Sequence, residues 1–146
     1  LYRVGNHSIA EDLVSDAFEK ALTRYNTYNP EKAKLSTWLF AIVNNTIINY
    51  HKKQQHYSPS LELENMESKY RLEDLVIELE LKEILLKSLM ALDERQRNIV
   101  ALKFGAGLTN REIAQITELT ESNVGTILYR ALRRLRDIIK QDAVKN

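Results

Sequence analysis

The sequence contains no cysteine, only four glycines and only two prolines among its 146 residues. Disulfides and thiolate metal sites are therefore excluded, and the chain is compatible with a reducing cytoplasm. Because glycine and proline are scarce and helix-forming residues run in long stretches, the composition predicts an all-α protein. No apolar run approaches the roughly eighteen residues of a membrane span, and no signal peptide is visible. We therefore expect a cytoplasmic protein without a membrane span.

An excess of one charge is also lacking, because the net charge is only +1. The charges are nevertheless unevenly distributed along the chain. Residues 61–94 hold ten acidic and four basic side chains, whereas residues 128–146 hold six basic and two acidic ones. The 44% hydrophobic content fits one globular domain or two small ones. The pattern argues against a protein that is basic all over and draws attention to the C-terminal end.

Apolar residues at helical spacing predict two helices in the first half, over residues 9–25 and 36–53. Ser8 is the expected N-cap of the first, with Glu11 completing a capping box. The turn-rich stretch between them contains Pro30, which disfavours helix at the preceding residue. The apolar face of the first helix consists of Leu13, Val14, Ala17, Phe18, Ala21 and Leu22.

Residues 55–70 are polar and without periodicity, which is typical of a linker, although a loop within one domain has the same composition. Further helices are predicted over residues 71–92 and 94–104. Asp93 is expected to cap the latter, and the glycines that follow should end it. The expected architecture is two small helical domains, residues 1–54 and 71–146, joined by a flexible linker.

Two closely spaced caps mark a helix-turn-helix near the C-terminus. Thr109 precedes a two-turn helix and has Glu112 at the capping-box position, and Thr120 caps the next helix. Glu118 stands where the turn usually has glycine. If Glu118 is left-handed, we expect a cost of about 1 kcal/mol.

The second helix of this motif, over residues 120–136, carries polar side chains off its apolar stripe. Short polar residues near the start of such a helix suit base edges in a major groove, and later arginines suit phosphates. An amphipathic helix whose arginines offset its own dipole would have a similar pattern, but the tight turn and paired caps favour DNA binding. The candidate DNA-binding residues are Glu121, Ser122, Asn123, Thr126, Tyr129, Arg130, Arg133 and Arg134.

In the first half, aromatic residues alternate with lysines and asparagines. Exposed bases stack on aromatic rings, and phosphates meet cations, so this mixture suits a single nucleic-acid strand. Trp38 and Phe40 are equally typical of a helical core, which leaves Tyr28 as the better stacking candidate. The candidate strand-binding residues are Tyr28, Lys34, Trp38, Asn44 and Asn45.

The first predicted helix also has an acidic edge formed by Glu11, Asp12, Asp16 and Glu19. Such an edge is either simply solvated or docks a basic partner, and composition does not decide between them. Enzymatic patterns are weak: the three histidines have no metal-ligand spacing, and no glycine-rich phosphate loop occurs. We predict no catalysis, metal or cofactor.

Three segments resemble the sigma-70 family of bacterial RNA polymerase initiation factors, above all the small group called extracytoplasmic-function sigma factors. "AEDLVSDAFEKAL" (10–22) is similar to region 2.2, and "YNPEKAKLSTWLFAIVNNTIINYHKK" (28–53) to regions 2.3 and 2.4. "LDERQRNIVALKFGAGLTNREIAQITELTESNVGTILYRALRRLR" (92–136) is similar to region 4. The order and spacing of these segments cover nearly the whole chain.

The resemblance implies core bacterial RNA polymerase and promoter DNA as partners. Region 2 would recognise and melt the −10 element, with an extruded base near residues 28–35. Region 4 would bind the −35 element through residues 120–136 and touch the polymerase β flap near residues 93–104. An anti-sigma factor is a common partner in this group. The β′ coiled coil would be bound by Asp12, Leu13, Asp16, Phe18 and Glu19.

The chain departs from the family pattern at a few positions. Gly125 and Ile127 replace frequent basic residues of the recognition helix, and Ala41 and Asn44 replace common arginines near the −10 strand. The N-terminal helix of region 2 is expected to be mostly missing. The alternatives are a stand-alone helix-turn-helix regulator that binds duplex DNA without polymerase, and a helical interaction module that binds no DNA.

Overall fold

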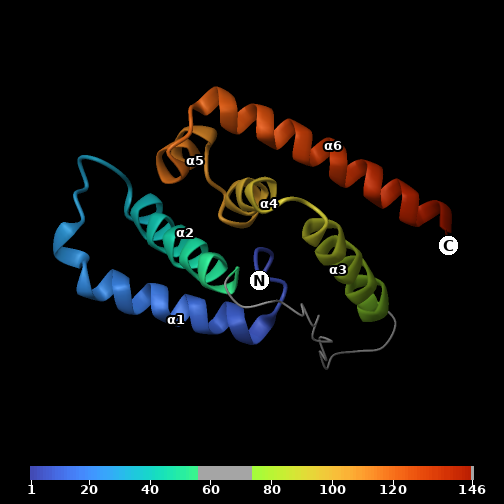
Figure 1. Ribbon diagram of the computed structural model, residues 1–146, viewed down its shortest axis with the longest axis horizontal. Coiled ribbons are helices and arrows are strands. Elements are labelled where there is room, and N and C mark those ends of the chain that lie inside the picture. The colour runs from blue at the N-terminus through green and yellow to red at the C-terminus, as the bar shows by residue number, and fades with distance from the viewer. Residues whose placement is uncertain (56–73, 146) are drawn as a thin grey trace.

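The structure, a computed structural model, describes residues 1–55 and 74–145, with side chains over 1–55 and 79–141. Throughout these residues the regular structure is helical, which confirms the all-α prediction (Figure 1). The elements are α1 (His7–Thr23), the 3₁₀ turn η1 (Tyr25–Thr27), α2 (Leu35–Gln54), α3 (Asp74–Met90), α4 (Glu94–Val100), the π-helical turn η2 (Ala101–Gly105), α5 (Asn110–Thr117) and α6 (Glu121–Lys145).

Helices α1 and α2 form an antiparallel hairpin at one end of the molecule (Figure 1). Its small core contains Ala17 and Ala21 of α1 and Ile42 of α2. Trp38 is partly buried against this cluster. Because the α1 side of the core is built from alanine, the two helices approach closely along that line.

The N-terminus of α1 differs from the prediction. The backbone N–H of Ile9 donates to Asn6 Oδ1 over 2.9 Å, so Asn6 is the N-cap and Ser8 lies within the first turn. Asparagine caps helices as well as serine does. Gly5, at φ 71°, turns the chain just before Asn6, which takes the extended conformation of a cap. Glu11 pairs with His7 instead of closing a capping box.

The predicted apolar face of α1 is buried only in part. Only Ala17 and Ala21 of the six residues are buried, whereas Val14, Phe18 and Leu22 are 48%, 54% and 79% exposed. These three residues are spaced by four and follow one side of the helix. The neighbouring helix α2 covers only the alanine side, so α1 presents an apolar ridge to solvent.

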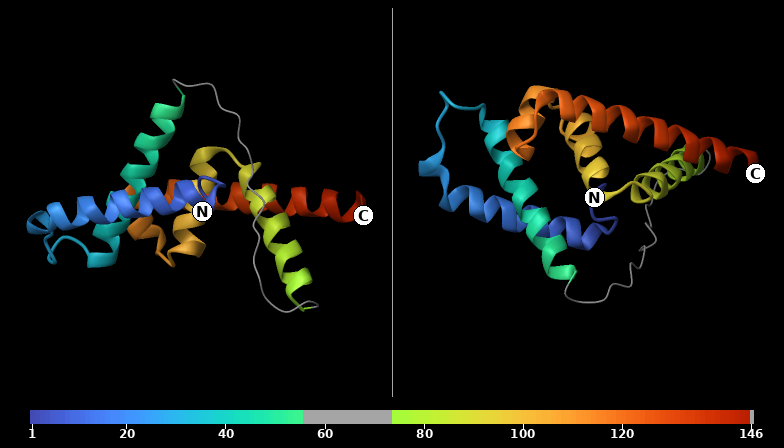
Figure 2. Two further views of the ribbon diagram at one scale, coloured as in Figure 1. Left: turned by 90° about the horizontal axis from the view of Figure 1, so that it is seen from below. Right: turned by 45° about the horizontal axis from the view of Figure 1, so that its top comes forward.

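The C-terminal half packs around α4, α5 and α6. Ile99, Ile113 and Val124, one from each helix, are all 0% exposed and belong to one core cluster. A second cluster contains Leu89 of α3 and Leu135 of α6, and so joins α3 to the long C-terminal helix (Figure 2). The cap of α4 is Asp93, as predicted, since it accepts from the backbone N–H of Gln96 over 2.8 Å.

The predicted helix over 94–104 is interrupted. After α4 the chain makes the π-helical turn η2, in which the backbone N–H of Ala106 donates to the carbonyl oxygen of Ala101, five residues earlier. Leu102 is buried by this turn, whereas Phe104 faces solvent.

The two halves of the chain touch one another. Helix α2 packs against α5, and Phe40 and Ala41 of α2 lie against the core cluster of the C-terminal half. The predicted linker, apart from Gln55 at the end of α2, lies outside the described residues, as does the predicted start of the third helix. The division at residues 54 and 71 remains a prediction.

Candidate nucleic-acid interface

The helix-turn-helix is built by the predicted caps. The backbone N–H of Glu112 donates to Thr109 Oγ1 over 3.2 Å, and the Thr109 backbone N–H donates to Glu112 Oε2 over 2.9 Å. This reciprocal pair is the expected capping box of α5. The backbone N–H of Asn123 donates to Thr120 Oγ1 over 3.1 Å, which caps the start of α6. Both helix starts are therefore set by local hydrogen bonds.

The turn between α5 and α6 has the backbone expected of a glycine. Glu118 has φ 57° and ψ 30°, in the left-handed region. Among the described residues other than glycine, it alone has a positive φ. The Cβ atom of an L-residue is crowded there, so the turn is strained.

Replacing Glu118 by glycine should therefore raise the free energy of unfolding by about 0.5–1 kcal/mol, because the strain of the left-handed backbone is relieved. Urea denaturation followed by circular dichroism measures this change. The matched control is Gln115→Gly, at an exposed position within α5, where glycine should lower stability by about 1 kcal/mol. A loss of stability in both variants would contradict the assignment of strain to the turn.

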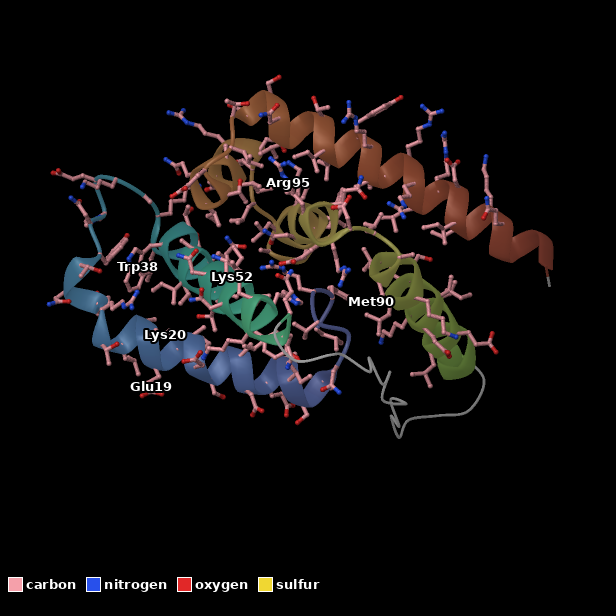
Figure 3. All side chains as sticks on the ribbon, in the orientation of Figure 1. Glu19, Lys20, Trp38, Lys52, Met90 and Arg95 are labelled. Carbon is pink, nitrogen blue, oxygen red and sulfur yellow. The ribbon has the colours of Figure 1, made fainter. Side chains whose placement is uncertain are left out.

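The outer face of α6 carries the predicted duplex-binding residues. All eight are exposed, and Tyr129 is 68% exposed. Nitrogen-tipped side chains stand along the side of α6 turned away from α4 (Figure 3). Ser122, Thr126, Tyr129 and Arg133 follow one another at spacings of four, three and four residues. They form a single stripe opposite the buried residues of the helix.

An aromatic cluster joins the α1–α2 connection to α2. The ring centroids of Tyr28 and Trp38 are 5.5 Å apart, and those of Tyr25 and Trp38 are 6.5 Å apart with the rings nearly perpendicular. Trp38 lies at the connection end of α2 (Figure 3). Trp38 packs against the core of the hairpin and also contacts the rings of the two tyrosines. Tyr28 is half-buried and Tyr25 exposed, so Tyr25 is a stacking candidate as well as Tyr28.

The other strand-binding candidates differ in their exposure to solvent and in their contacts. Asn45 is exposed on α2, Lys34 is exposed but paired with Glu112 of α5, and Asn44 is only 2% exposed. The exposed stripe that begins at Asn45 continues through Asn49 and Lys52, at spacings of four and three residues. Lys52 lies on α2 in Figure 3. Helical spacing from Asn45 could have indicated both additional residues.

On α1, Asp12, Phe18 and Glu19 are exposed, whereas Leu13 is half-buried. Asp16 is engaged within the helix, because Lys20 Nζ donates to Asp16 Oδ2 over 2.7 Å. In Figure 3, Lys20 points toward α2 and Glu19 away from it.

The exposed acids therefore flank an apolar ridge formed by Val14, Phe18 and Leu22 (the α1 ridge). Val14 and Leu22 were predicted only as part of the apolar face of the helix and not as residues that bind a partner. A ridge of this kind with an acidic border suits a basic protein partner.

The carboxyl group of Glu112 has a strongly shifted pKa. The backbone N–H of Thr109, followed by the Lys34 ammonium and the Thr109 hydroxyl, donates to it and lowers its pKa from 4.5 to about 2. Since these bonds favour the charged form in the folded state, their contribution is complete above pH 4.5. It is lost as the pH falls from 4.5 toward 2.

The stability advantage of the wild type over Glu112→Gln should therefore shrink between pH 6 and pH 3. Glutamine retains a capping oxygen but carries no charge. Urea unfolding of both proteins at the two pH values measures the difference. An equal advantage at both pH values would contradict the role of the charge.

Within the described part of the chain, no helix is both long and apolar enough to cross a bilayer.

Two family models match the two halves of the chain. The family model of sigma-70 region 2 matches residues 1–57, and that of sigma-70 region 4 matches residues 82–135. The first contains the hairpin with its aromatic cluster, and the second contains the helix-turn-helix.

Among curated proteins, the ECF RNA polymerase sigma-E factor of Escherichia coli K12 is 32% identical over 131 residues, which cover 82% of this chain and 68% of that protein. The ECF RNA polymerase sigma factor BldN of Streptomyces coelicolor is 31% identical over 97% of this chain. The chain spans 55% of BldN, little more than half its length.

Among solved structures, the sigma factor RpoE of Bartonella quintana, in complex with the anti-sigma factor NepR, matches with a TM-score of 0.75. The match covers 95% of this chain and 88% of that one, at 23% identity, and shows a shared fold. On its sequence matches and its fold, the chain belongs to the sigma-70 family, as an ECF-like member with regions 2 and 4.

Proposed function

We propose that this chain directs core bacterial RNA polymerase to promoters and starts transcription there. In this proposal the outer face of α6 binds the −35 element. The aromatic cluster and the exposed stripe of α2 capture the melted −10 strand. The α1 ridge and its acids bind the β′ coiled coil, and α4 with its surroundings touches the β flap. The chain supplies promoter recognition in the cytoplasm and performs no catalysis of its own.

The observation that carries the proposal is the presence, in one chain, of two exposed surfaces with different compositions, each of which suits a different form of DNA. The outer face of α6 has short polar side chains followed by arginines, as a protein that recognises duplex DNA requires. The α2 surface has clustered aromatic rings beside lysines and asparagines, as a protein that binds a single strand requires. A protein that opens DNA at one element while holding duplex at another needs both.

The stand-alone regulator is the less favoured alternative. It would explain the helix-turn-helix of α5 and α6, but it would not explain why the α1 ridge is exposed. Because a solvent-exposed apolar ridge is costly unless a partner covers it, the ridge supports a polymerase partner. The relative RpoE is bound to an anti-sigma factor, and we propose a partner of that class for this chain as well.

The test combines binding and transcription. The chain is mixed with sigma-free core polymerase and a genomic promoter library, and run-off transcripts are sequenced. Initiation at a discrete set of promoters is the expected result. Specific duplex binding without any affinity for core polymerase would instead establish the stand-alone regulator.

Phe18→Ala should weaken binding to core polymerase about tenfold or more, because truncating an aromatic anchor at an interface typically costs about 2 kcal/mol. Fluorescence anisotropy of labelled protein titrated with core polymerase measures the Kd. The matched control is Ile139→Ala, which truncates another exposed apolar residue, on α6. If both variants bind as tightly as the wild type, the α1 ridge is not the polymerase site.

A further inference from the structure

A glycine lies near the start of α6 where the backbone does not require one. Gly125 is about one turn into the helix, which begins at Glu121. Among the described glycines only Gly5 and Gly107 have a positive φ, so Gly125 has a backbone that any residue adopts. Glycine is among the least favourable residues in a helix interior. Gly125 therefore weakens the helix on which the proposed −35 contact depends.

Packing within the protein does not require the missing side chain either. Beyond its own helix, a Cβ atom placed on Gly125 would come within 3.9 Å of Asn110 Nδ2 of α5, an ordinary van der Waals distance. A Cβ atom on Gly5, by comparison, would lie only 3.1 Å from Met90 Sδ. Within the described part of the chain, an alanine at position 125 would therefore fit and would favour the helix. The fold gives no reason for this glycine.

Gly125 lies at the edge of the outer face of α6, on the side of α5. Successive residues of a helix are about 100° apart around its axis, so Gly125 lies beside the buried side that includes Val124. The exposed stripe through Ser122 and Tyr129 is on its other side. Its neighbour across this edge is Asn110, at the start of α5. Helix α5 lies next to the first turns of α6 (Figure 1).

A helix that enters a major groove has little room at its edges. An α-helix with its side chains is about 10–12 Å across, and the major groove of B-DNA is about 12 Å wide. When the stripe through Ser122, Thr126 and Tyr129 points at the base edges, the two edges of the helix face the sugar–phosphate strands that border the groove. A glycine at one edge lets a strand approach the helix backbone closely.

The start of α5 offers donors to the same strand. Arg111 is exposed and Asn110 is partly exposed. Asn110 Nδ2 is the atom that lies next to the open space at Gly125. Guanidinium and amide N–H groups are common donors to phosphate oxygens in protein–DNA complexes. A strand that passes Gly125 would therefore find hydrogen-bond donors on the other side of this edge.

We infer that the sugar–phosphate backbone of one DNA strand contacts α6 at Gly125, and that the missing side chain determines how deeply the helix enters the groove of the −35 element. The inference rests on the proposed function. It explains why a residue that weakens the helix stands in this position: Gly125 lowers the stability of the free protein and raises its affinity for DNA.

Gly125→Ala should therefore change stability and binding in opposite directions. Alanine is the best helix former, so the midpoint of urea unfolding should rise. The added methyl group would meet the DNA strand, and overfilling a close contact should weaken promoter binding about fivefold or more. Gly125→Leu introduces another good helix former with a larger side chain, and it should weaken binding further.

Binding is measured with holoenzyme formed from core polymerase and each variant. The template is a promoter from the library experiment whose −10 region is held open by mismatched bases, and a second template differs only in a scrambled −35 element. Filter binding gives the Kd for each template. The matched control is Gly105→Ala, at an exposed glycine without a positive φ, where the Cβ atom would lie 4.0 Å from Tyr2 Cδ2.

The expected result is weaker binding of the Gly125→Ala holoenzyme to the intact promoter, with no change on the scrambled template and none for Gly105→Ala. Wild-type affinity of Gly125→Ala for the intact promoter would overturn the inference. An equal loss on both templates would also overturn it, because the effect would then lie outside the −35 contact. A lower midpoint of unfolding would show that the fold itself needs the glycine.

Each of these contrary results leaves the proposed function intact, since the wild-type holoenzyme still binds the promoter. If the wild-type holoenzyme binds neither template, the proposed function fails and the role of Gly125 fails with it. The two failures are therefore distinguished by the wild-type measurement alone.

Discussion

Replacing both Tyr129 and Arg130 by alanine should reduce initiation at specific promoters on the order of a hundredfold. Both side chains are exposed on the outer face of α6, where a major groove would receive them. Each good contact to a base favours the correct base pair over a wrong one by about 1–3 kcal/mol. The two losses of free energy add, so the corresponding reductions in initiation multiply. Run-off transcription with core polymerase at a promoter found in the library experiment measures the effect.

The control for this experiment is Lys140→Ala, on the same helix but beyond the recognition segment. It also removes an exposed positive charge, so it tests whether loss of charge alone is sufficient. We expect near-normal initiation from this variant. Equal activity of the double variant and the control would show that the outer face of α6 does not bind the −35 element.

The second large effect concerns stability. Ile113→Ala should lower the free energy of unfolding by about 2–5 kcal/mol, because the truncation leaves a cavity among fully buried side chains. Ile113 is 0% exposed and packs in the core cluster with Ile99 and Val124. Since small domains are stable by only about 5–15 kcal/mol, this loss should leave the C-terminal half close to unfolding.

Urea denaturation followed by circular dichroism measures this loss. The matched control is Leu132→Ala on α6, where the side chain is 42% exposed and the expected cost is below about 1 kcal/mol. Similar losses in both variants would contradict the packing described here. The two large effects are separable, because the α6 surface variant should unfold like the wild type while failing to initiate.

The parts of the structure that could be predicted from sequence are those fixed by neighbours in the chain. The Thr109–Glu112 capping box, the Thr120 cap and the left-handed Glu118 each depend on a few consecutive residues. Both caps were predicted, and Glu118 was identified as the residue in the usual place of the turn glycine. The cap of α1 was predicted two residues too late. Asn6 and Ser8 are comparable caps, and the deciding factor was the turn at Gly5.

The parts that could not be predicted depend on contacts between distant residues. Helical periodicity identified the apolar residues of α1 but not which of them α2 would cover, so the exposure of Val14 and Leu22 was not predicted. The burial of Asn44 follows from Asn98, which lies 54 residues further along the chain. No local pattern around either asparagine indicates that the two amides meet.

The π-helical turn η2 determines how the segment between α4 and α5 would respond to a change in its length. A π-helical turn holds one residue more than an α-helical turn would need. Deleting one residue from Ala101–Gly105 should therefore convert η2 to a regular α-helical turn and leave the later residues close to their present register. A deletion within the regular α-helix Asn110–Thr117 has no such extra residue to lose, and it would rotate the residues after it by about 100° and shift them by about 1.5 Å. The outer face of α6 should therefore keep its present position better after the first deletion than after the second.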